Sequence, residues 1–279
     1  MRDLSNDTRF ISLNTATVKT KWNLEEIIDG CARHGIGGIS PWRDQVEQCG
    51  IDYAAKLIKD AGLQVTGLCR GGMFPASTAA GRQANIDDNR RAIDEAATLG
   101  ADCLVLVVGG LPVGSKNIDE TRDQVFDGIS AVLDHARSNN IPLAIEPLHP
   151  MYAADRACVN TMKQALDICD LLGTGIGVAL DVYHVWWDPD LQEQTMRAGK
   201  NNQLLGYHVC DWMVPTNDML TDRGMMGDGI IDLKKIRGWI EAAGYKGCCE
   251  VEIFSSDNWW KRDPDDVLRT CIERHQTVV

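Results

Sequence analysis

Short apolar runs alternate with amphipathic, helix-like segments along the whole chain. Continuous apolar runs are typical of parallel strands buried on both faces, and an apolar residue every three to four positions is typical of helices that cover them. The strand-like runs lie at residues 9–15, 35–40, 64–70, 102–109, 142–148, 175–182, 204–210 and 248–254. Helical patterns follow them at 23–35, 46–61, 84–99, 119–138, 160–172, 189–198, 232–243 and 264–276. The pattern therefore predicts eight strand and helix pairs.

The predicted helix boundaries carry suitable capping residues. Asn23 suits the N-cap of the first helix, and Glu26, three residues further on, comes close to a capping box. Several helices are expected to end at glycine or asparagine, as helix C-termini prefer. These residues are Gly35, Gly62, Gly100, Asn139, Gly173 and Gly244.

Four of the strand-like runs in the second half of the chain each place one possible metal ligand near their C-terminal end. The spacings between successive members of this set are 35, 27 and 44 residues, so local geometry cannot bring them together, but each gap is long enough for a crossover between parallel strands. The four residues are Glu146, Asp181, His208 and Glu252. They converge only if their strands are neighbours in one sheet.

Eight such units form either a closed barrel or an open doubly wound sheet, and periodicity alone does not separate the two. An open sheet would spread the four side chains over roughly 15 Å at the usual strand spacing. A closed barrel collects them at the C-terminal ends of its strands, where such barrels place their active sites. No GxGxxG motif follows the first run, which removes the usual reason to propose a dinucleotide fold. We therefore predict an α/β fold, a (β/α)8 TIM barrel, with residues 1–279 as a single domain.

The last strand-like run places two acids on one face, because successive side chains of a strand alternate. Glu250 and Glu252 both point inward on this reading. A buried carboxylate is costly unless it is paired or bound to a metal, so the four-residue set predicts a metal site, with a structural salt-bridge network as the alternative. Glu250 is expected to support the site from below. An oxygen-rich set with one imidazole suits one divalent ion, Mn²⁺ in the first place, with Mg²⁺, Co²⁺ or Zn²⁺ as alternatives.

Composition narrows the possible partners. The net charge of −12 argues against a nucleic-acid partner, and no segment has the roughly 18 uninterrupted apolar residues of a membrane helix. The opening residues lack the pattern of a secretory signal, so a cytoplasmic protein is expected, with its ten cysteines reduced and mostly buried. A small neutral or weakly charged ligand fits this composition best. The oligomeric state is left open, with a homo-oligomer or a partner subunit both compatible.

Several short motifs resemble the sugar phosphate isomerase/epimerase superfamily, also called the xylose-isomerase-like barrels. They are IEPLHP, ALDVYH, GYHVCDW, DRGMMGDGIIDL and VEIF, and the similarity covers nearly the whole chain. The inosose isomerase and ketose 3-epimerase branches are the most similar. The resemblance implies that Glu146, Asp181, His208 and Glu252 hold the metal, and that His184 and Arg223 contact the substrate.

One position departs from the epimerase pattern. Ketose 3-epimerases carry a second glutamate six residues after the first metal ligand, where this chain has Tyr152. Instead His149 stands three residues after Glu146, similar in placement to a histidine of the inosose isomerase branch, with a plain surface residue as the alternative. Two further candidates for substrate contact follow strands: Trp187 for stacking on a sugar, and Arg70 for a hydroxyl or phosphate group. In the absence of a clustered basic loop, an unphosphorylated sugar is the favoured substrate.

The leading hypothesis is a metal-dependent isomerase or epimerase acting on a sugar, inosose or similar polyhydroxy ketone. In it Glu146 and Glu252 exchange the proton on the carbon next to the carbonyl, giving an enediolate. The first alternative is a lyase or dehydratase on oxo-glycosides or oxo-inositols, in which His149 serves as acid and base. An endonuclease IV-like enzyme would need more histidines than the six present and a basic groove. A barrel that only binds sugar is the last alternative.

Overall fold

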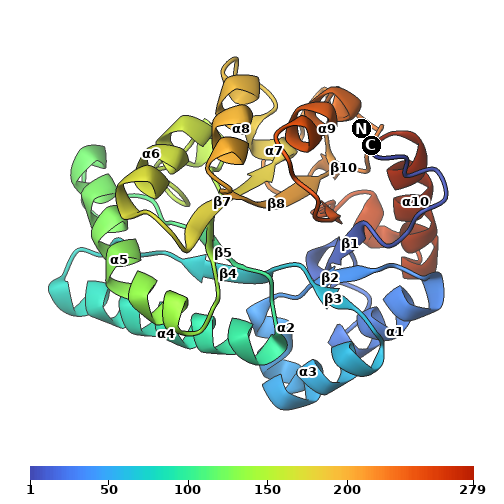
Figure 1. Ribbon diagram of the computed structural model, residues 1–279, viewed down its shortest axis with the longest axis horizontal. Helices are drawn as coiled ribbons and strands as arrows, with labels where there is room; N and C mark the ends of the chain where they lie inside the picture. Colours follow the sequence, from blue (N-terminus) through green and yellow to red (C-terminus); the bar gives the residue numbers. More distant parts are fainter.

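A computed structural model describes residues 1–279 and shows a ring of parallel strands surrounded by helices (Figure 1). Nine strands form the central sheet: β1 (Ile11–Asn14), β2 (Gly38–Ser40), β3 (Gln64–Val65), β4 (Leu68–Gly72), β5 (Leu104–Val107), β6 (Leu143–Ile145), β7 (Ile176–Asp181), β8 (Leu204–Val209) and β11 (Cys249–Val251). A separate antiparallel pair, β9 (Asp211–Trp212) and β10 (Arg223–Gly224), lies in the loop after β8.

The strands follow one another around a barrel in the order β3-β2-β1-β11-β8-β7-β6-β5-β4, and every pairing in this sheet is parallel. The two ends of this order, β3 and β4, are halves of the single run predicted at 64–70, which bends between them. Next to this bend the Cys69 N–H donates to Pro41 O, just after β2, and the Leu68 N–H donates to Cys103 O, just before β5. The predicted (β/α)8 barrel is thus confirmed, with one strand broken in two.

The helices lie outside the barrel, as Figure 1 shows. They are α1 (Leu24–His34), α2 (Arg43–Cys49), α3 (Ile51–Asp60), α4 (Ala79–Leu99), α5 (Ile118–Ser138), α6 (Met162–Leu172), α7 (Val182–Val185), α8 (Leu191–Lys200), α9 (Leu233–Ala242) and α10 (Pro264–Thr277). The predicted capping box of α1 is present, with Asn23 and Glu26 hydrogen-bonded to each other's backbone N–H groups. The prediction of a single helix at 46–61 is wrong in one respect. This region contains two helices, α2 and α3, which are separated at Gly50, whose φ is 89°.

Most of the apolar core lies between the sheet and the helices, where 66 buried residues form one cluster. Inside the barrel the apolar residues are fewer and smaller. They form a cluster of five, namely Cys69, Cys103, Val105, Ala144 and Ala179. Small side chains here leave room in the barrel for the polar residues that the strand ends carry.

Candidate metal centre

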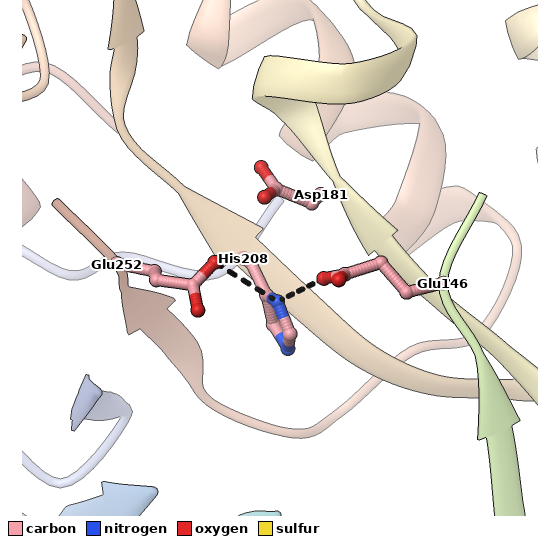
Figure 2. Close-up of side chains that lie close together, drawn as sticks. All are labelled: Glu146, Asp181, His208 and Glu252. Carbon is pink, nitrogen blue, oxygen red and sulfur yellow. Dashed lines mark ion pairs between the residues drawn. The ribbon is translucent and has the colours of Figure 1, made fainter. Parts of the chain in front are cut away.

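The strand ends bring the four predicted ligands together. Asp181 is the last residue of β7, and His208 is the last but one of β8. The two are register partners in the sheet. Glu146 and Glu252 each follow directly after a strand, β6 and β11. Figure 2 shows the imidazole of His208 between Glu146 and Glu252, with Asp181 above them in this view. We call Glu146, Asp181, His208 and Glu252 the strand-end cluster.

The geometry of the strand-end cluster suits a single ion. One donor atom from each residue lies within 4.8 Å of all the others, and all four residues are buried. His208 Nδ1 is 3.0 Å from Glu146 Oε1 and 3.9 Å from Glu252 Oε2. Ligands held about 2.0 to 2.2 Å from one metal ion are separated from each other by about this much. The residues present therefore fit a divalent ion.

Two buried atoms of the strand-end cluster have no hydrogen-bond partner in the protein. They are Glu146 Oε1 and His208 Nδ1, which face each other without the alignment of a hydrogen bond. The carboxylate of Glu146 accepts no hydrogen bond from any donor of the chain. A buried polar atom without a partner costs about 1–3 kcal/mol, so this pair has a physical reason to bind an ion.

The electrostatics of the strand-end cluster also favour the binding of a divalent ion. Burial would lower the pKa of His208, but Glu250, Glu146 and Glu252 outweigh it and raise this pKa well above its ordinary value. Burial, helped by Glu146, raises the pKa of Glu252 to about 8 despite the nearby Arg223 guanidinium. Both groups thus hold a proton near neutral pH when no ion is bound. A divalent ion would replace those protons.

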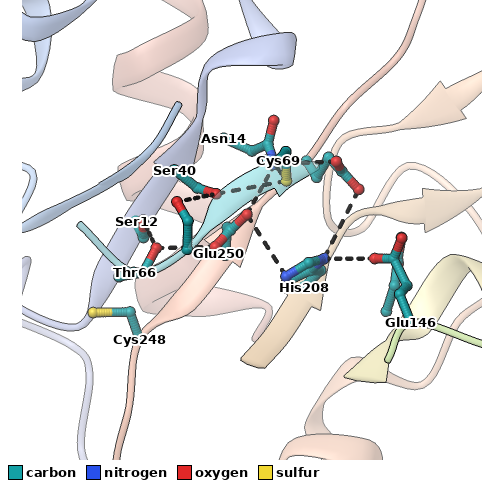
Figure 3. A network of polar contacts seen from close by, with 12 residues as sticks. Ser12, Asn14, Ser40, Thr66, Cys69, Glu146, His208, Cys248 and Glu250 are labelled. Atoms are coloured by element: carbon teal, nitrogen blue, oxygen red, sulfur yellow. Dashed lines mark hydrogen bonds and ion pairs between the residues drawn. The ribbon is translucent and has the colours of Figure 1, made fainter. Parts of the chain in front are cut away.

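A second set of polar residues lies beneath the strand-end cluster (Figure 3). Glu250 is the register partner of His208, and its Oε1 lies 3.6 Å from His208 Nε2. Its other oxygen accepts a 2.9 Å hydrogen bond from the Thr66 hydroxyl, which is 2.7 Å from the Ser12 hydroxyl. We call Ser12, Thr66 and Glu250 the inner layer. Glu250 thus lies deeper in the barrel than Glu252, as expected from the sequence, and the structure shows in addition that it faces the imidazole of His208.

Asn14 connects the inner layer to the strand-end cluster. Its side-chain N–H₂ donates to Glu250 Oε1 at 2.8 Å and to Glu252 Oε1 at 3.0 Å. Its carbonyl oxygen accepts from Trp42 Nε1 and from the Ala16 N–H, which fixes the direction of the amide. Sequence analysis missed Asn14 as a site residue. Its position at the C-terminal end of the first strand was the available signal.

Arg223 and His184 form the wall beside Asp181. Arg223 Nη1 donates to Asp181 Oδ2 at 2.8 Å and to Glu252 Oε2 at 3.0 Å, and its Nη2 lies 3.1 Å from His184 Nε2. Burial lowers the pKa of His184 to about 3, so its ring is neutral and Nε2 accepts from Arg223. The proton of the ring is then on Nδ1, which has no partner in the protein.

A cavity opens over the strand-end cluster. Arg70, His184 and Arg223, all three predicted to contact the substrate, line it. Tyr152 and Arg156, from the loop after β6, line it as well, and sequence analysis gave neither a role in binding. The remaining lining residues are Trp42, Cys69, Val105, Val107, Glu146, Leu148, Leu220, Glu252 and Phe254.

The structure does not bring His149 and Trp187 to the lining of this cavity. His149 stacks on Trp212 with ring centroids 5.0 Å apart and meets the edge of Trp187 at 5.7 Å. Its Nδ1 accepts a hydrogen bond from the Met151 N–H, and burial lowers its pKa. The indole N–H of Trp187 donates to His184 O. Their catalytic and substrate-binding roles stay predictions.

Comparison with known proteins places the chain in a family. The sequence profile described as "Xylose isomerase-like TIM barrel" matches residues 28–271. The chain belongs to this family. The resemblance inferred from the short motifs is thereby confirmed, and no curated protein sequence matches the chain.

Solved structures share the whole fold of this chain. Protein SMc04130 from Sinorhizobium meliloti 1021 is 63% identical, with a TM-score of 0.97 and coverage of 98% of this chain and 99% of that one. The IolI protein, whose crystal structure holds a zinc atom, is 21% identical with a TM-score of 0.82, covering 96% and 97%. D-allulose 3-epimerase from Methylomonas sp. is 20% identical with a TM-score of 0.78, also covering 96% and 97%.

Two predictions made from composition bear on this picture. All ten cysteines are free, and all but Cys49 are buried, as expected for reduced thiols that pack as small apolar groups. None of the helices combines the length and the apolarity that a crossing of the bilayer requires.

Proposed function

We propose that this protein is a divalent-metal-dependent isomerase or epimerase of a sugar, inosose or similar polyhydroxy ketone. The observation that carries the proposal is the strand-end cluster, in which Glu146 Oε1 and His208 Nδ1 are buried and without partners. Membership of the xylose isomerase-like family supports a sugar-related substrate. Mn²⁺ remains the first choice of ion, although the ion in the IolI structure is zinc.

The residues that would hold the ion are Glu146, Asp181, His208 and Glu252. Bound there, a divalent ion would supply Lewis acidity that makes the proton on the carbon beside a ketone easier to remove. Glu252 carries a carboxylate at the floor of the cavity and is suited both to accept and to return the substrate proton. Glu146 offers a second carboxylate oxygen facing the same space. The two glutamates are thus placed to exchange the substrate proton.

Other residues of the cavity are suited to orient the substrate. His184 lines the cavity, and its neutral ring carries on Nδ1 a buried proton for which the protein offers no acceptor. Arg223 is already bound to Asp181 and Glu252, so its main effect is to hold these carboxylates in place. Apolar side chains such as Val105, Val107 and Leu148 limit the access of water.

The position of His149 favours an isomerase over a lyase. Elimination from an oxo-glycoside needs a group that protonates the leaving oxygen, and His149 was the candidate for that step. Its ring is stacked on Trp212, and its Nδ1 is engaged with the Met151 N–H. A lyase would therefore have to move this ring, whereas proton exchange between Glu146 and Glu252 needs no such movement.

Solvent-deuterium exchange followed by NMR tests the proposal. The Mn²⁺-loaded protein should incorporate deuterium at the carbon next to the carbonyl of at least one member of a panel of ketoses, inososes and 3-oxo-glucosides. Glu252→Gln should reduce the rate by at least about 10²-fold, the usual effect of a positioned acid or base. His149→Ala should keep most of the activity. Elimination products that disappear in His149→Ala would instead establish the lyase.

A further inference from the structure

Two arginines in the cavity have no counter-ion. Arg70 belongs to β4, and Arg156 to the loop that follows β6, so two strands on the same side of the barrel, with only β5 between them, supply the two arginines. Both line the cavity over the strand-end cluster, and both are partly buried. They are the only arginines of the chain whose guanidinium groups make neither a hydrogen bond nor an ion pair with another residue.

The neighbouring arginines show what an engaged guanidinium looks like in this region. Arg43, which follows β2, binds Glu95 and Asp88 through four hydrogen bonds. Arg223 binds Asp181 and Glu252. Two acids of the strand-end cluster are thus already paired with Arg223. No acid lies within ion-pair distance of Arg70 or Arg156.

An unpaired guanidinium in a cavity is costly. Burial lowers the pKa of Arg70, and the positive charge of Arg156 lowers it further, while Glu146 acts in the opposite direction. The only contact recorded for the Arg156 guanidinium is with the ring of Tyr152, at 5.6 Å from the centroid. Partly buried cations that repel each other are stabilised by an anion between them, and arginine favours carboxylate and phosphate oxygens because its N–H groups bind two of them at once.

We propose, on the basis of the function proposed above, that the substrate is a polyhydroxy ketone carrying an anionic group, a carboxylate or a phosphate, which Arg70 and Arg156 bind. The cavity that the two arginines share is lined in part by Val105, Val107, Leu148 and Leu220, whose side chains contribute no donors. A neutral sugar would leave both guanidinium groups unpaired next to these walls. Such an anionic substrate differs from the neutral or weakly charged ligand that composition suggested, since the net charge of the whole chain does not determine the charge of one cavity.

Calorimetric titration of the Mn²⁺-loaded protein with three ketones tests this proposal. The probes are D-fructose, which is neutral, 5-keto-D-gluconate, which carries a carboxylate, and D-fructose 6-phosphate. At least one anionic probe should bind about tenfold or more tightly than fructose, as charge-assisted hydrogen bonds imply. The better of the two anions identifies the group that the arginines take.

Substitutions of the arginines test whether the anionic group binds to them or to the metal ion. Arg70→Met and Arg156→Met should each remove most of the preference for the anion, and Arg70→Lys should retain part of it. Arg269→Met is the matched control, because it removes the same charge from an exposed ion pair on α10 and should leave the preference unchanged. A preference that survives in both methionine variants, or no preference in the wild type, would overturn the proposal.

The same three ketones distinguish this proposal from the proposed function. Binding that depends on the arginines, with no deuterium incorporated into any probe, would count against the isomerase assignment alone. Deuterium incorporation into all three probes with equal kcat/KM would count against the arginine assignment alone.

Discussion

The barrel encloses two sets of buried carboxylates that differ in how they are satisfied. Glu250 of the inner layer receives one hydrogen bond at each oxygen, from Asn14 and from Thr66. Glu146 of the strand-end cluster receives none, although it is similarly buried. The inner layer is therefore complete within the protein, whereas the strand-end cluster needs something from outside. Burial of an acid therefore does not by itself identify a metal site, and the lack of a donor to Glu146 is the observation that favours an ion at the strand-end cluster.

The largest expected effect comes from exchanging one carboxylate in each set for an amide. Glu146→Gln should lose most of its bound metal and reduce deuterium exchange by at least about 10²-fold, because it removes a ligand charge and a proton acceptor. Glu250→Gln, the matched control, should keep its metal within about tenfold, since Glu250 acts only through the imidazole. Metal analysis and exchange rates measure both. Equal losses in the two variants would remove the distinction between the two sets.

Metal addition should stabilise the wild type. An ion present at 100 times its dissociation constant adds about 2.7 kcal/mol to the free energy of unfolding, which corresponds to a rise in Tm of roughly 5–10 °C for a chain of this size. Glu250→Gln should show a similar rise, and His208→Ala should show none. Thermal scans in chelator and in Mn²⁺ provide the comparison. A rise in His208→Ala equal to that of the wild type would place the ion elsewhere.

The stabilisation by metal should depend on pH. The pKa of Glu252 is raised to about 8 from 4.5, and that of His208 is also raised, so the metal-free folded protein retains protons that the unfolded chain has released. These two groups make the metal-free protein less stable as pH rises from about 4.5 to 8. Metal binding displaces the protons, so apparent affinity should increase by roughly tenfold per pH unit for each proton released up to pH 8. Titrations with Mn²⁺ at pH 6, 7 and 8 measure this slope. An affinity independent of pH would mean that neither proton is displaced.

The smallest expected effect tests the link between the two sets. Asn14→Ala removes the donor shared by Glu250 and Glu252, and should lower the free energy of unfolding in chelator by about 1–3 kcal/mol. Ser40→Ala is the control, because the Ser40 hydroxyl donates to Gly67 O inside the barrel and touches neither acid. Its loss should be about 1 kcal/mol or less. Urea unfolding provides the values, and equal losses would show that Asn14 has no special role.

The eight strand and helix pairs, and the four residues of the strand-end cluster, follow from the sequence alone. Continuous apolar runs determine buried parallel strands, and the end of each run determines which edge of the sheet its polar residue reaches. For Asp181 and His208 this local information was sufficient. The pattern did not reveal the break between β3 and β4 or the division of residues 46–61 at Gly50, because both depend on how the chain curves around the barrel.

Only the tertiary structure decided which polar groups lack partners. Arg43 follows β2 and Arg70 lies within β4, yet Glu95 and Asp88 bind the guanidinium of Arg43 whereas no group of the chain binds that of Arg70. Arg156 had no local signal, because it reaches the cavity from an irregular loop. His149 seemed well placed three residues after Glu146, but stacking on Trp212 holds its ring away from the cavity lining. The pairing of charges and rings joins residues that are distant in the chain, and no local pattern contains that information.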